Sequence, residues 1–539
     1  MKKLLILTAA AAFSSSLFAG GLLTNTNQSA SWVRMPSQDA STGIEAVYFN
    51  PAGLMKLNNG FHFSLSNQFI SQKKEVENFY KGPGDMFGLN QSLYKGTVSA
   101  PLFPSIYAAY KMDKIAFSFG FNPIGGGGGA IFDKGLPSFE MSPSDLVPSL
   151  ASKGVTDYRL DAYFEGTSVF FGYQAGISYK ISDMISVFGG VRYVTAKNTY
   201  NGYLRNIEVY NFMGGGEWMR ADLLLGGFAQ SASDGAAGAG QFVAGGLGDY
   251  TFTDAENMVA GDPTKVAQLQ ALDAGLQSFG INTTGMTLAQ AQGAYTATAA
   301  TYSAKASLLA DQEADVEQTG HGITPIIGVN ISPSEKLNVG IKYEFATKIE
   351  LENKTTSDLT TGYTAEGVPV TMFPNGAKTR SDMPAMLSVG VSYQATSKLH
   401  ATLGGHYYYD TKANYGKSIA GETVGNEKVI DRNYFEAAAG LEYNISDKLL
   451  ISGGYLLAQT GVNENYQSDL SYSLSSSTIG FGGKYSVNEN VGINLGVGYT
   501  IYENGEKTIQ HEFNGSFIPA RETYYKNNLF IGVGVDLSF

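Results

Sequence analysis

The sequence contains no cysteine, which excludes disulfide bonds and any thiol chemistry. After the first 19 residues it has no run of about 18 apolar residues, so we expect no transmembrane helix. Basic residues are in the minority, with 36 Lys and Arg against 48 Asp and Glu, and the net charge of -12 argues against nucleic acid as a partner. The few histidines occur in no nucleophile motif and at no metal-ligand spacing, so we expect no enzyme, no metal and no cofactor.

Residues 1–19 have the features of a secretory signal peptide. Lys2 and Lys3 form a charged start, an apolar run follows, and small residues precede Gly20. We therefore expect cleavage near Gly20 and export of the mature chain.

Alternation of apolar and polar residues dominates the mature chain, together with 66 glycines, 33 tyrosines and 31 phenylalanines. In the segment 491–501, large apolar side chains fall on one face, and glycine, asparagine and threonine fall on the other. A soluble sandwich would fill its core with bulky side chains, whereas a transmembrane barrel is apolar outside and polar inside. Because every backbone amide in hydrocarbon must be paired, we predict an all-β fold, a closed antiparallel barrel in the bacterial outer membrane.

Short polar turns follow a tyrosine at several points, as after Tyr179, Tyr393, Tyr443 and Tyr485. We expect these rings to form an aromatic girdle at one membrane interface. About fourteen strands are predicted, an even number that places both chain ends on the periplasmic side. They lie near 60–71, 102–112, 114–122, 162–181, 184–202, 321–332, 337–352, 382–395, 398–412, 431–445, 448–461, 469–486, 490–504 and 526–539. The last strand resembles the aromatic-ended strand by which outer-membrane proteins are recognised for insertion; the alternative fold is a secreted β-solenoid or adhesin.

Two parts of the chain interrupt this pattern on either side of the first strands. Residues 20–59 lack sustained alternation, and the predicted barrel, residues 60–539, encloses more space than its own side chains fill. We therefore expect the segment 20–59 to be a hatch that plugs the lumen. The second interruption is a run of glycines, which weaken strands and mark bulges. A flexible external loop is the simpler interpretation of this run, and a break in the barrel wall is the functional one. The run consists of Gly125, Gly126, Gly127, Gly128 and Gly129.

The third irregular segment is a long extracellular insertion at about 205–320. Helices are predicted at 263–279, behind an Asp262-Pro263 start, and at 287–312, behind a capping box of Thr287 and Gln290. Both helices carry apolar residues at helical spacing. This apolar seam could face the extracellular rim, or it could pack only within the insertion and stiffen it.

Taken together, these features resemble the FadL-type family of outer-membrane long-chain fatty-acid and hydrocarbon transporters over essentially the whole mature chain. Asn50, Pro51 and Ala52 match the family's hatch motif, and the segments 324–343 and 383–393 resemble its later strand pairs. The resemblance implies a fourteen-stranded barrel, a plugging hatch, and lateral exit of the ligand at a kinked third strand. It also implies that the helices of the insertion form an extracellular ligand groove.

The resemblance implies passive uptake of hydrophobic small molecules, with long-chain fatty acids as the expected cargo and aromatic hydrocarbons as the alternative. A fatty acid gains about 0.8 kcal/mol for each methylene it buries, and the lipopolysaccharide leaflet is a poor entry point, so a conduit into the membrane is useful. We expect the ligand and outer-membrane lipid to be the partners of a monomeric protein.

A carboxylate ligand needs a cation, and strand alternation turns Arg192 and Lys342 toward the lumen, so they are the candidate ligand-binding residues. The alternative is that each pairs with an inward carboxylate such as Glu344 and fastens the wall or the hatch.

Rival functions come from other classes. A general diffusion porin would have an open lumen, which the predicted hatch argues against. A surface adhesin would use the insertion as its binding surface. An enzyme would need a catalytic set, and we interpret His400, His406 and Asp410, which share one inward face, as lumen lining rather than as an acid/base or metal site.

Overall fold

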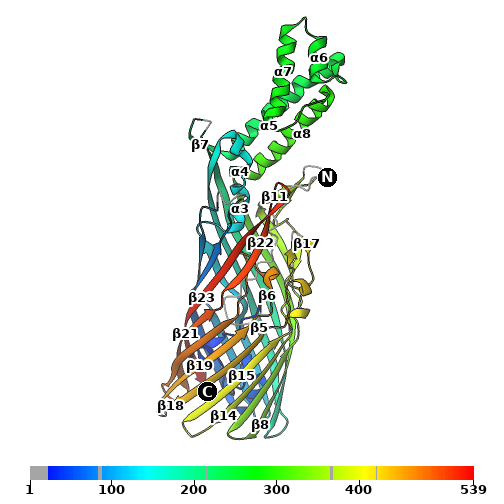
Figure 1. Cartoon of the computed structure of the whole chain (residues 1–539). Coiled ribbons are helices and arrows are strands. Elements are labelled where there is room, and N and C mark those ends of the chain that lie inside the picture. The colour runs from blue at the N-terminus through cyan, green and yellow to red at the C-terminus, as the bar shows by residue number, and fades with distance from the viewer. Residues whose placement is uncertain (1–21, 83–87, 213–214, 365–367, 420–421) are drawn as a thin grey trace.

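The computed structural model describes residues 22–82, 88–212, 215–364, 368–419 and 422–539, so the predicted signal peptide, residues 1–19, lies outside the described residues. The chain forms a closed antiparallel β-barrel of 14 strands, as predicted. Closure is direct, because β1 (Gly60–Asn78) pairs along most of its length with the last strand, β23 (Ser516–Ser538). Short turns gather at one end of the barrel, and the helices of the insertion stand beyond the other (Figure 1).

Three early strands matter most for function. The second barrel strand is split into β2 (Leu93–Ala100) and β3 (Pro104–Met112), which both pair with β1, and the third is β4 (Ile115–Phe132). The remaining wall strands are β5 (Val155–Lys180), β6 (Ile185–Asn211), β8 (Gln312–Ser334), β9 (Leu337–Glu344) with β10 (Glu350–Ser357), β13 (Lys378–Arg380) with β14 (Met386–Gln394), β15 (Leu399–Tyr408), β18 (Phe435–Asn444), β19 (Leu449–Gln459), β20 (Ser476–Ser486), and β21 (Val491–Tyr502) with β22 (Gly505–Phe513).

Several strands are much longer than a bilayer requires. β5 and β6 contain 26 and 27 residues, whereas about 9–11 residues cross the hydrocarbon. The extra length, which was not predicted, lies on the side of the long loops and raises the wall above the membrane. The loops add short elements: β7 (Glu217–Arg220), β11 (Thr360–Tyr363), β12 (Pro369–Thr371), β16 (Ser418–Ile419), β17 (Glu422–Thr423), α3 (Pro137–Ser144), α4 (Leu146–Leu150), η3 (Ala151–Lys153), η5 (Asp410–Lys412), η6 (Asn426–Lys428) and η7 (Glu464–Tyr466).

The predicted alternation is present in the wall. On β21, Leu495 is 57% exposed on the outer face, whereas the neighbouring Asn494 is 1% exposed and points into the lumen. The tyrosines that precede the short turns, such as Tyr179 and Tyr393, are exposed as a girdle requires.

The described part of the insertion contains four α-helices, and a helical turn, η4 (Val243–Leu247), joins the first two. The helices are α5 (Ala221–Phe242), α6 (Phe252–Met258), α7 (Pro263–Ser278) and α8 (Leu288–Leu309). The wall strands continue to Asn211 and resume at Gln312, so the insertion is shorter than the predicted 205–320. Both predicted caps are present: Asp262 accepts from two backbone amides of α7, and Thr287 opens a capping box at α8. None of the described helices is long and apolar enough to cross a membrane.

The apolar seam of α7 and α8 is covered by packing, partly within the helical unit and partly against the barrel wall. Leu269, Leu276, Leu288 and Tyr295 are buried in one cluster with Phe242 at the end of α5. The seam is therefore occupied by packing within the insertion and, at Tyr302 and Leu309, against a cluster that includes residues of β5 and β6, rather than lining an open groove.

Residues 22–59 form the hatch inside the barrel. They include α1 (Ser29–Arg34), α2 (Ala46–Phe49) and the 3₁₀ helix η1 (Pro51–Lys56), and most of their side chains are buried. Helix α1 contacts strands β19, β20, β21, β23 and β1, which places it against the last strands and the closing seam of the barrel.

A band of inward glycines, termed here the glycine belt, receives the hatch backbone. A methyl group added to Gly480 would lie 2.3 Å from the carbonyl oxygen of Val33, and one added to Gly390 would lie 2.5 Å from the carbonyl carbon of Asp39. A larger residue at either of these two positions would therefore displace the hatch. The belt comprises Gly340, Gly390, Gly404, Gly440, Gly454, Gly480, Gly496 and Gly532.

Candidate functional site

The Asn50-Pro51-Ala52 motif ties the hatch to three wall strands. Its asparagine amide donates to Asn330 Oδ1 of β8 at 2.7 Å. Its proline carbonyl accepts from the Ser178 hydroxyl of β5 at 2.7 Å, and its alanine carbonyl accepts from the Ser186 hydroxyl of β6 at 2.7 Å. The motif therefore lies at a polar contact between hatch and wall.

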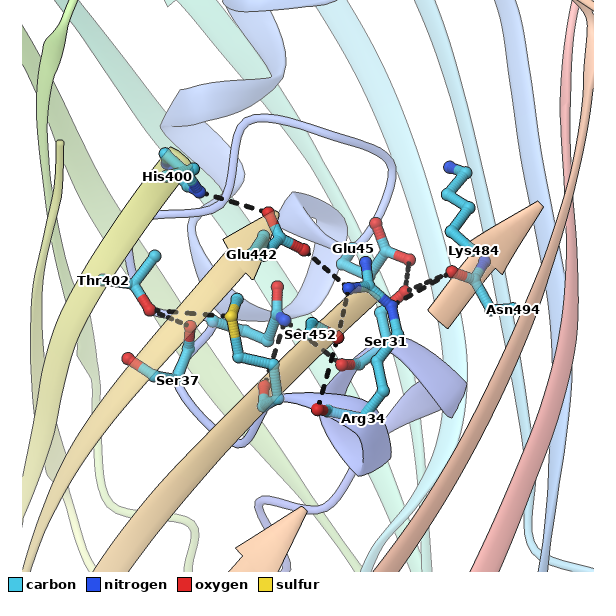
Figure 2. Close-up of polar contacts among 12 residues, drawn as sticks. Ser31, Arg34, Ser37, Glu45, His400, Thr402, Glu442, Ser452, Lys484 and Asn494 are labelled. Atoms are coloured by element: carbon cyan, nitrogen blue, oxygen red, sulfur yellow. Dashed lines mark hydrogen bonds and ion pairs between the residues drawn. The ribbon is translucent and has the colours of Figure 1, made fainter. Parts of the chain in front are cut away.

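Arg34, at the end of α1, makes a second polar contact with the wall. Its guanidinium forms an ion pair with Glu442 of β18 at 2.6 Å and donates to Ser452 of β19 at 2.8 Å (Figure 2). It also donates to Asn494 of β21 at 3.3 Å, while His400 Nδ1 lies 3.1 Å from the second Glu442 oxygen. The arginine side chain is 7% exposed. A buried hatch charge is thus neutralised by the wall.

A third contact joins Asp39 of the hatch to His406 of β15. His406 Nε2 lies 2.7 Å from Asp39 Oδ1, and its Nδ1 lies 2.7 Å from Glu436 Oε2. His400 and His406 therefore serve different hatch contacts. Asp410, in the loop after β15, accepts from a tyrosine hydroxyl, and burial raises its pKa to about 6. These three residues do not assemble into one site, and the described residues contain no group of three His, Asp or Glu side chains that could hold a metal ion.

The barrel wall is interrupted at the glycine run. β3 pairs with β4 up to Phe121, and β2 pairs with β4 only from Gly129 onward, so residues 122–128 have no ladder partner on the second barrel strand. On its other side, β4 loses register with β5 twice. Gly125 to Gly129 thus lie within a strand, not in an external loop, and they coincide with a break in the hydrogen-bonded wall.

Prolines on the facing strand belong to the same break, and our sequence analysis missed them. Pro101 and Pro104 bracket the gap between β2 and β3, and proline has no N–H to donate to a ladder. Between them, Leu102 is 78% exposed while Phe103 is buried. The signal available in the sequence was a pair of prolines opposite a glycine run.

The start of the hatch occupies the place of the missing wall pairing. The backbone N–H of Asn25 donates to the Ile124 carbonyl at 2.7 Å, and the N–H of Gly126 donates to the Leu23 carbonyl at 3.3 Å. The side-chain amide of Asn25 also donates to the Gly126 carbonyl at 2.6 Å. Backbone groups that the break frees are therefore satisfied from inside the lumen.

Arg192 of β6 and Lys342 of β9 both face the lumen and share one carboxylate. Arg192 Nη1 lies 2.5 Å from Glu344 Oε2, and Lys342 Nζ lies 2.8 Å from Glu344 Oε1. Lys342 also donates to the Tyr48 carbonyl of the hatch at 2.7 Å, and Arg192 donates to Gln174 at 2.7 Å. Two buried cations thus face one carboxylate, and no described residue is hydrogen-bonded to Arg192 Nε.

This cluster borders a small cavity between the hatch start and the wall. The free volume is about 10 Å³, room for about one water molecule, so a larger ligand can enter only if the hatch moves. Thr24 Oγ1 and Asn25 Oδ1 are buried at this cavity, and no described residue is hydrogen-bonded to either atom. The cavity is lined by Thr24, Asn25, Thr26, Tyr48, Ile124, Arg192, Thr324, Glu344, Phe345, Thr347, Met383, Pro384, Met386 and Tyr408.

No family model and no curated protein sequence matches the chain. Among solved structures, the crystal structure of a Pseudomonas aeruginosa FadL homologue matches with a TM-score of 0.58 and 10% identity, over 96% of this chain and 100% of that chain. The protein has the FadL-type fold. Two mutant forms of TodX, a monoaromatic hydrocarbon channel, each match with a TM-score of 0.50 at 13% and 14% identity, over 96% and 95% of this chain and 100% and 98% of theirs. The likeness confirms the predicted hatch-and-barrel architecture.

Proposed function

We propose that this protein is a passive outer-membrane conduit for hydrophobic small molecules, with long-chain fatty acids as its main ligands. The observation that carries the proposal is a break in the barrel wall that the hatch itself seals. A diffusion porin has no use for such a break, because its solutes leave along the barrel axis. The proposal includes removal of residues 1–19 on export, a hatch formed by 20–59, and a barrel formed by 60–539 with its helical insertion outside.

Movement of the hatch start would open the break. When Leu23 and Asn25 withdraw, the gap beside residues 122–128 of β4 loses its inner cover. A hydrophobic ligand can then pass sideways into the bilayer, drawn by about 0.8 kcal/mol for each methylene that leaves water. Unpaired backbone groups are costly in hydrocarbon, so the break closes again once the ligand has left. This cycle needs no energy source.

The charge at the inner cavity favours a fatty acid over a hydrocarbon. Arg192 and Lys342 outnumber the single carboxylate of Glu344, and the unpartnered Arg192 Nε can donate to a ligand carboxylate. Monoaromatic hydrocarbons are the second candidate, supported by the likeness to TodX channels and by the apolar part of the cavity lining. Both candidates are transported without chemical change, so the proposal assigns no enzymatic activity.

A disulfide that locks the hatch tests the route. The Cβ of a residue at position 404 would lie 3.3 Å from the Asp39 Cβ, close to disulfide geometry, and the chain has no other cysteine. In Asp39→Cys/Gly404→Cys cells, labelled oleate uptake should fall to the level of cells without the gene, and a reductant should restore it. The matched control is Thr478→Cys/Thr500→Cys, which links two wall strands at a cross-strand pair.

The result separates the candidate functions. Unchanged oleate and toluene uptake in the oxidised, locked protein contradicts the route through the hatch. Arg192→Ala and Lys342→Ala should slow oleate uptake more than toluene uptake, and equal slowing of both ligands contradicts the assigned carboxylate recognition.

A further inference from the structure

The barrel wall is interrupted a second time, between β8 and the wall strand formed by β9 and β10. Residues 320–325 of β8 face the interval between β9 and β10 and belong to neither ladder. Between them and residues 345–349, the described backbone forms a single hydrogen bond, from the Phe345 N–H to the Pro325 carbonyl at 3.1 Å. Unpaired backbone groups are costly in hydrocarbon, so this second interruption needs a functional explanation, as the break at the glycine run does.

The second interruption lies at the height of the membrane. On β8, Ile323 and Ile327 are 62% and 52% exposed on either side of Pro325, as a lipid-facing surface requires. Phe345 is 43% exposed, and its ring packs edge-on against Tyr343 with 4.9 Å between centroids. The second interruption therefore faces lipid rather than the water above it.

The segment 345–349 is anchored in its middle on the side away from β8. Thr347 and Met383 exchange two backbone hydrogen bonds there, at 3.0 and 2.9 Å. The next residue after Met383 is Pro384, which has no N–H to donate to a ladder. A displacement at Phe345 would therefore open the wall without unpairing the strands on either side.

The inner cavity beside the hatch start extends to the second interruption. Its lining includes Thr324, Phe345, Thr347, Met383 and Pro384 from this place, and Ile124 from the break at the glycine run. Phe345 thus belongs both to the cavity lining and to the outer surface of the barrel. Since β5, β6 and β8 separate the two places, one cavity borders two distinct openings in the ladder.

The lining at the second interruption suits an uncharged ligand. The hydroxyls of Thr324 and Thr347 are hydrogen-bonded to each other, and Phe345, Met383 and Pro384 supply apolar surface around them. An ionised carboxylate would lose its hydration on this path without gaining a partner, whereas an apolar molecule has no such cost. The lining therefore selects against charge.

We propose that residues 345–349 form a second lateral portal, through which uncharged hydrophobic molecules pass between the inner cavity and the bilayer. The inference rests on the proposed uptake function and gives its uncharged ligands, the aromatic hydrocarbons, an exit of their own. Once the hatch start has moved, a ligand in the cavity needs only to displace Phe345 to reach lipid. A fatty acid, held by its carboxylate near Arg192, leaves by the break at the glycine run instead.

Passive exchange runs in both directions, so the portal can be tested from the lipid side. The purified mature chain in lipid nanodiscs is photolysed with a phenyldiazirine dissolved in the lipid, an uncharged photoreactive analogue of toluene. Adducts at Met383, which is 4% exposed in the cavity lining, are counted residue by residue by mass spectrometry. Val389, 40% exposed on the outer face of β14, gives the reference for direct labelling from lipid and shows that each variant is correctly inserted.

A disulfide across the second interruption should close it. The hydroxyls of Thr324 and Thr347 are hydrogen-bonded, so cysteines at these two positions lie within reach of each other. In Thr324→Cys/Thr347→Cys, oxidation should remove most adducts at Met383, and a reductant should restore them. Adducts at Ile124 should persist, because the probe still reaches this end of the cavity through the break at the glycine run.

Matched variants separate the portal from general effects on the wall. Thr478→Cys/Thr500→Cys joins two uninterrupted strands through hydroxyls 2.8 Å apart and should change no adduct. Phe345→Ala removes the ring at the portal and should raise the adducts at Met383. Phe481→Ala removes a ring that is 58% exposed on β20 and should leave them unchanged.

Equal adducts at Met383 in the oxidised and reduced disulfide variant overturn the inference. A parallel loss at Ile124 also overturns it, because the disulfide would then act on the whole cavity, and so do unchanged adducts in Phe345→Ala. The proposed function fails separately, if cells with the native protein take up neither oleate nor toluene faster than cells without the gene.

Discussion

Loss of the Arg34 side chain should release the hatch. Arg34→Met would leave Glu442 buried with only His400 beside it, and removal of one partner of a buried ion pair costs about 3–5 kcal/mol. At about 1.4 kcal/mol for each factor of ten, the undocked population of the hatch should rise roughly 100- to 4,000-fold. His400 can still compensate part of the Glu442 charge, which favours the lower end of this range.

A single introduced cysteine can report this equilibrium, because the native chain has none. Ser37 is 1% exposed within the docked hatch, so Ser37→Cys should react with a maleimide only when the hatch moves. In lipid nanodiscs, the labelling rate should rise with the undocked population, and conductance across planar bilayers should rise with it.

Two further variants test the reasoning. Arg34→Met/Glu442→Gln removes both charges, so its labelling should return close to that of the native hatch. Arg159→Met removes an ion pair whose arginine is 54% exposed and should change nothing. Labelling as slow in Arg34→Met as in the native background, or as fast in the double variant as in Arg34→Met, would refute the assignment of this ion pair as a hatch anchor.

Gly480→Ala should destabilise the docked hatch relative to the undocked one by about 1–3 kcal/mol, because its methyl group would meet the Val33 carbonyl. A methyl group at Gly189 would meet no other atom, so Gly189→Ala should leave the Ser37→Cys labelling rate unchanged. Burial lowers the pKa of Lys417 to about 7, so the docked state of the segment 409–419 favours the uncharged amine, and its docking should strengthen as pH rises from 7 toward 10. Slower protease cleavage of this segment at pH 9 than at pH 7 checks the sign, and Lys417→Met should abolish the difference.

Side-chain alternation made much of the barrel predictable. Within the membrane each strand must be apolar outside and polar inside, and this constraint placed the inward faces of Arg192 and Lys342 correctly. The same alternation placed Glu344 on the inner face, as a possible partner of both cations. It could not show that one carboxylate serves both cations, because this depends on side-chain geometry across neighbouring strands.

Other features lie where that constraint does not operate. Above the membrane a strand need not alternate, so the outer ends of β5 and β6 were missed. Helix α5 was missed as well, because it contains several glycines, which disfavour helices more than any residue except proline. Only one side of the wall break was predicted. The glycine run was noted, but Pro101 and Pro104 lie on the neighbouring strand, and their role is visible only once the pairing of the two strands is known.

The glycine belt has a consequence for assembly. At the level of the glycine belt, the inner wall has no side chains that could fill the lumen. A chain lacking residues 22–59 should therefore insert as an open pore rather than as a narrower sealed barrel. The hatch immediately precedes β1, and β1 forms the seam with β23. The segment that fills the lumen is therefore covalently joined to the strand at which the wall closes.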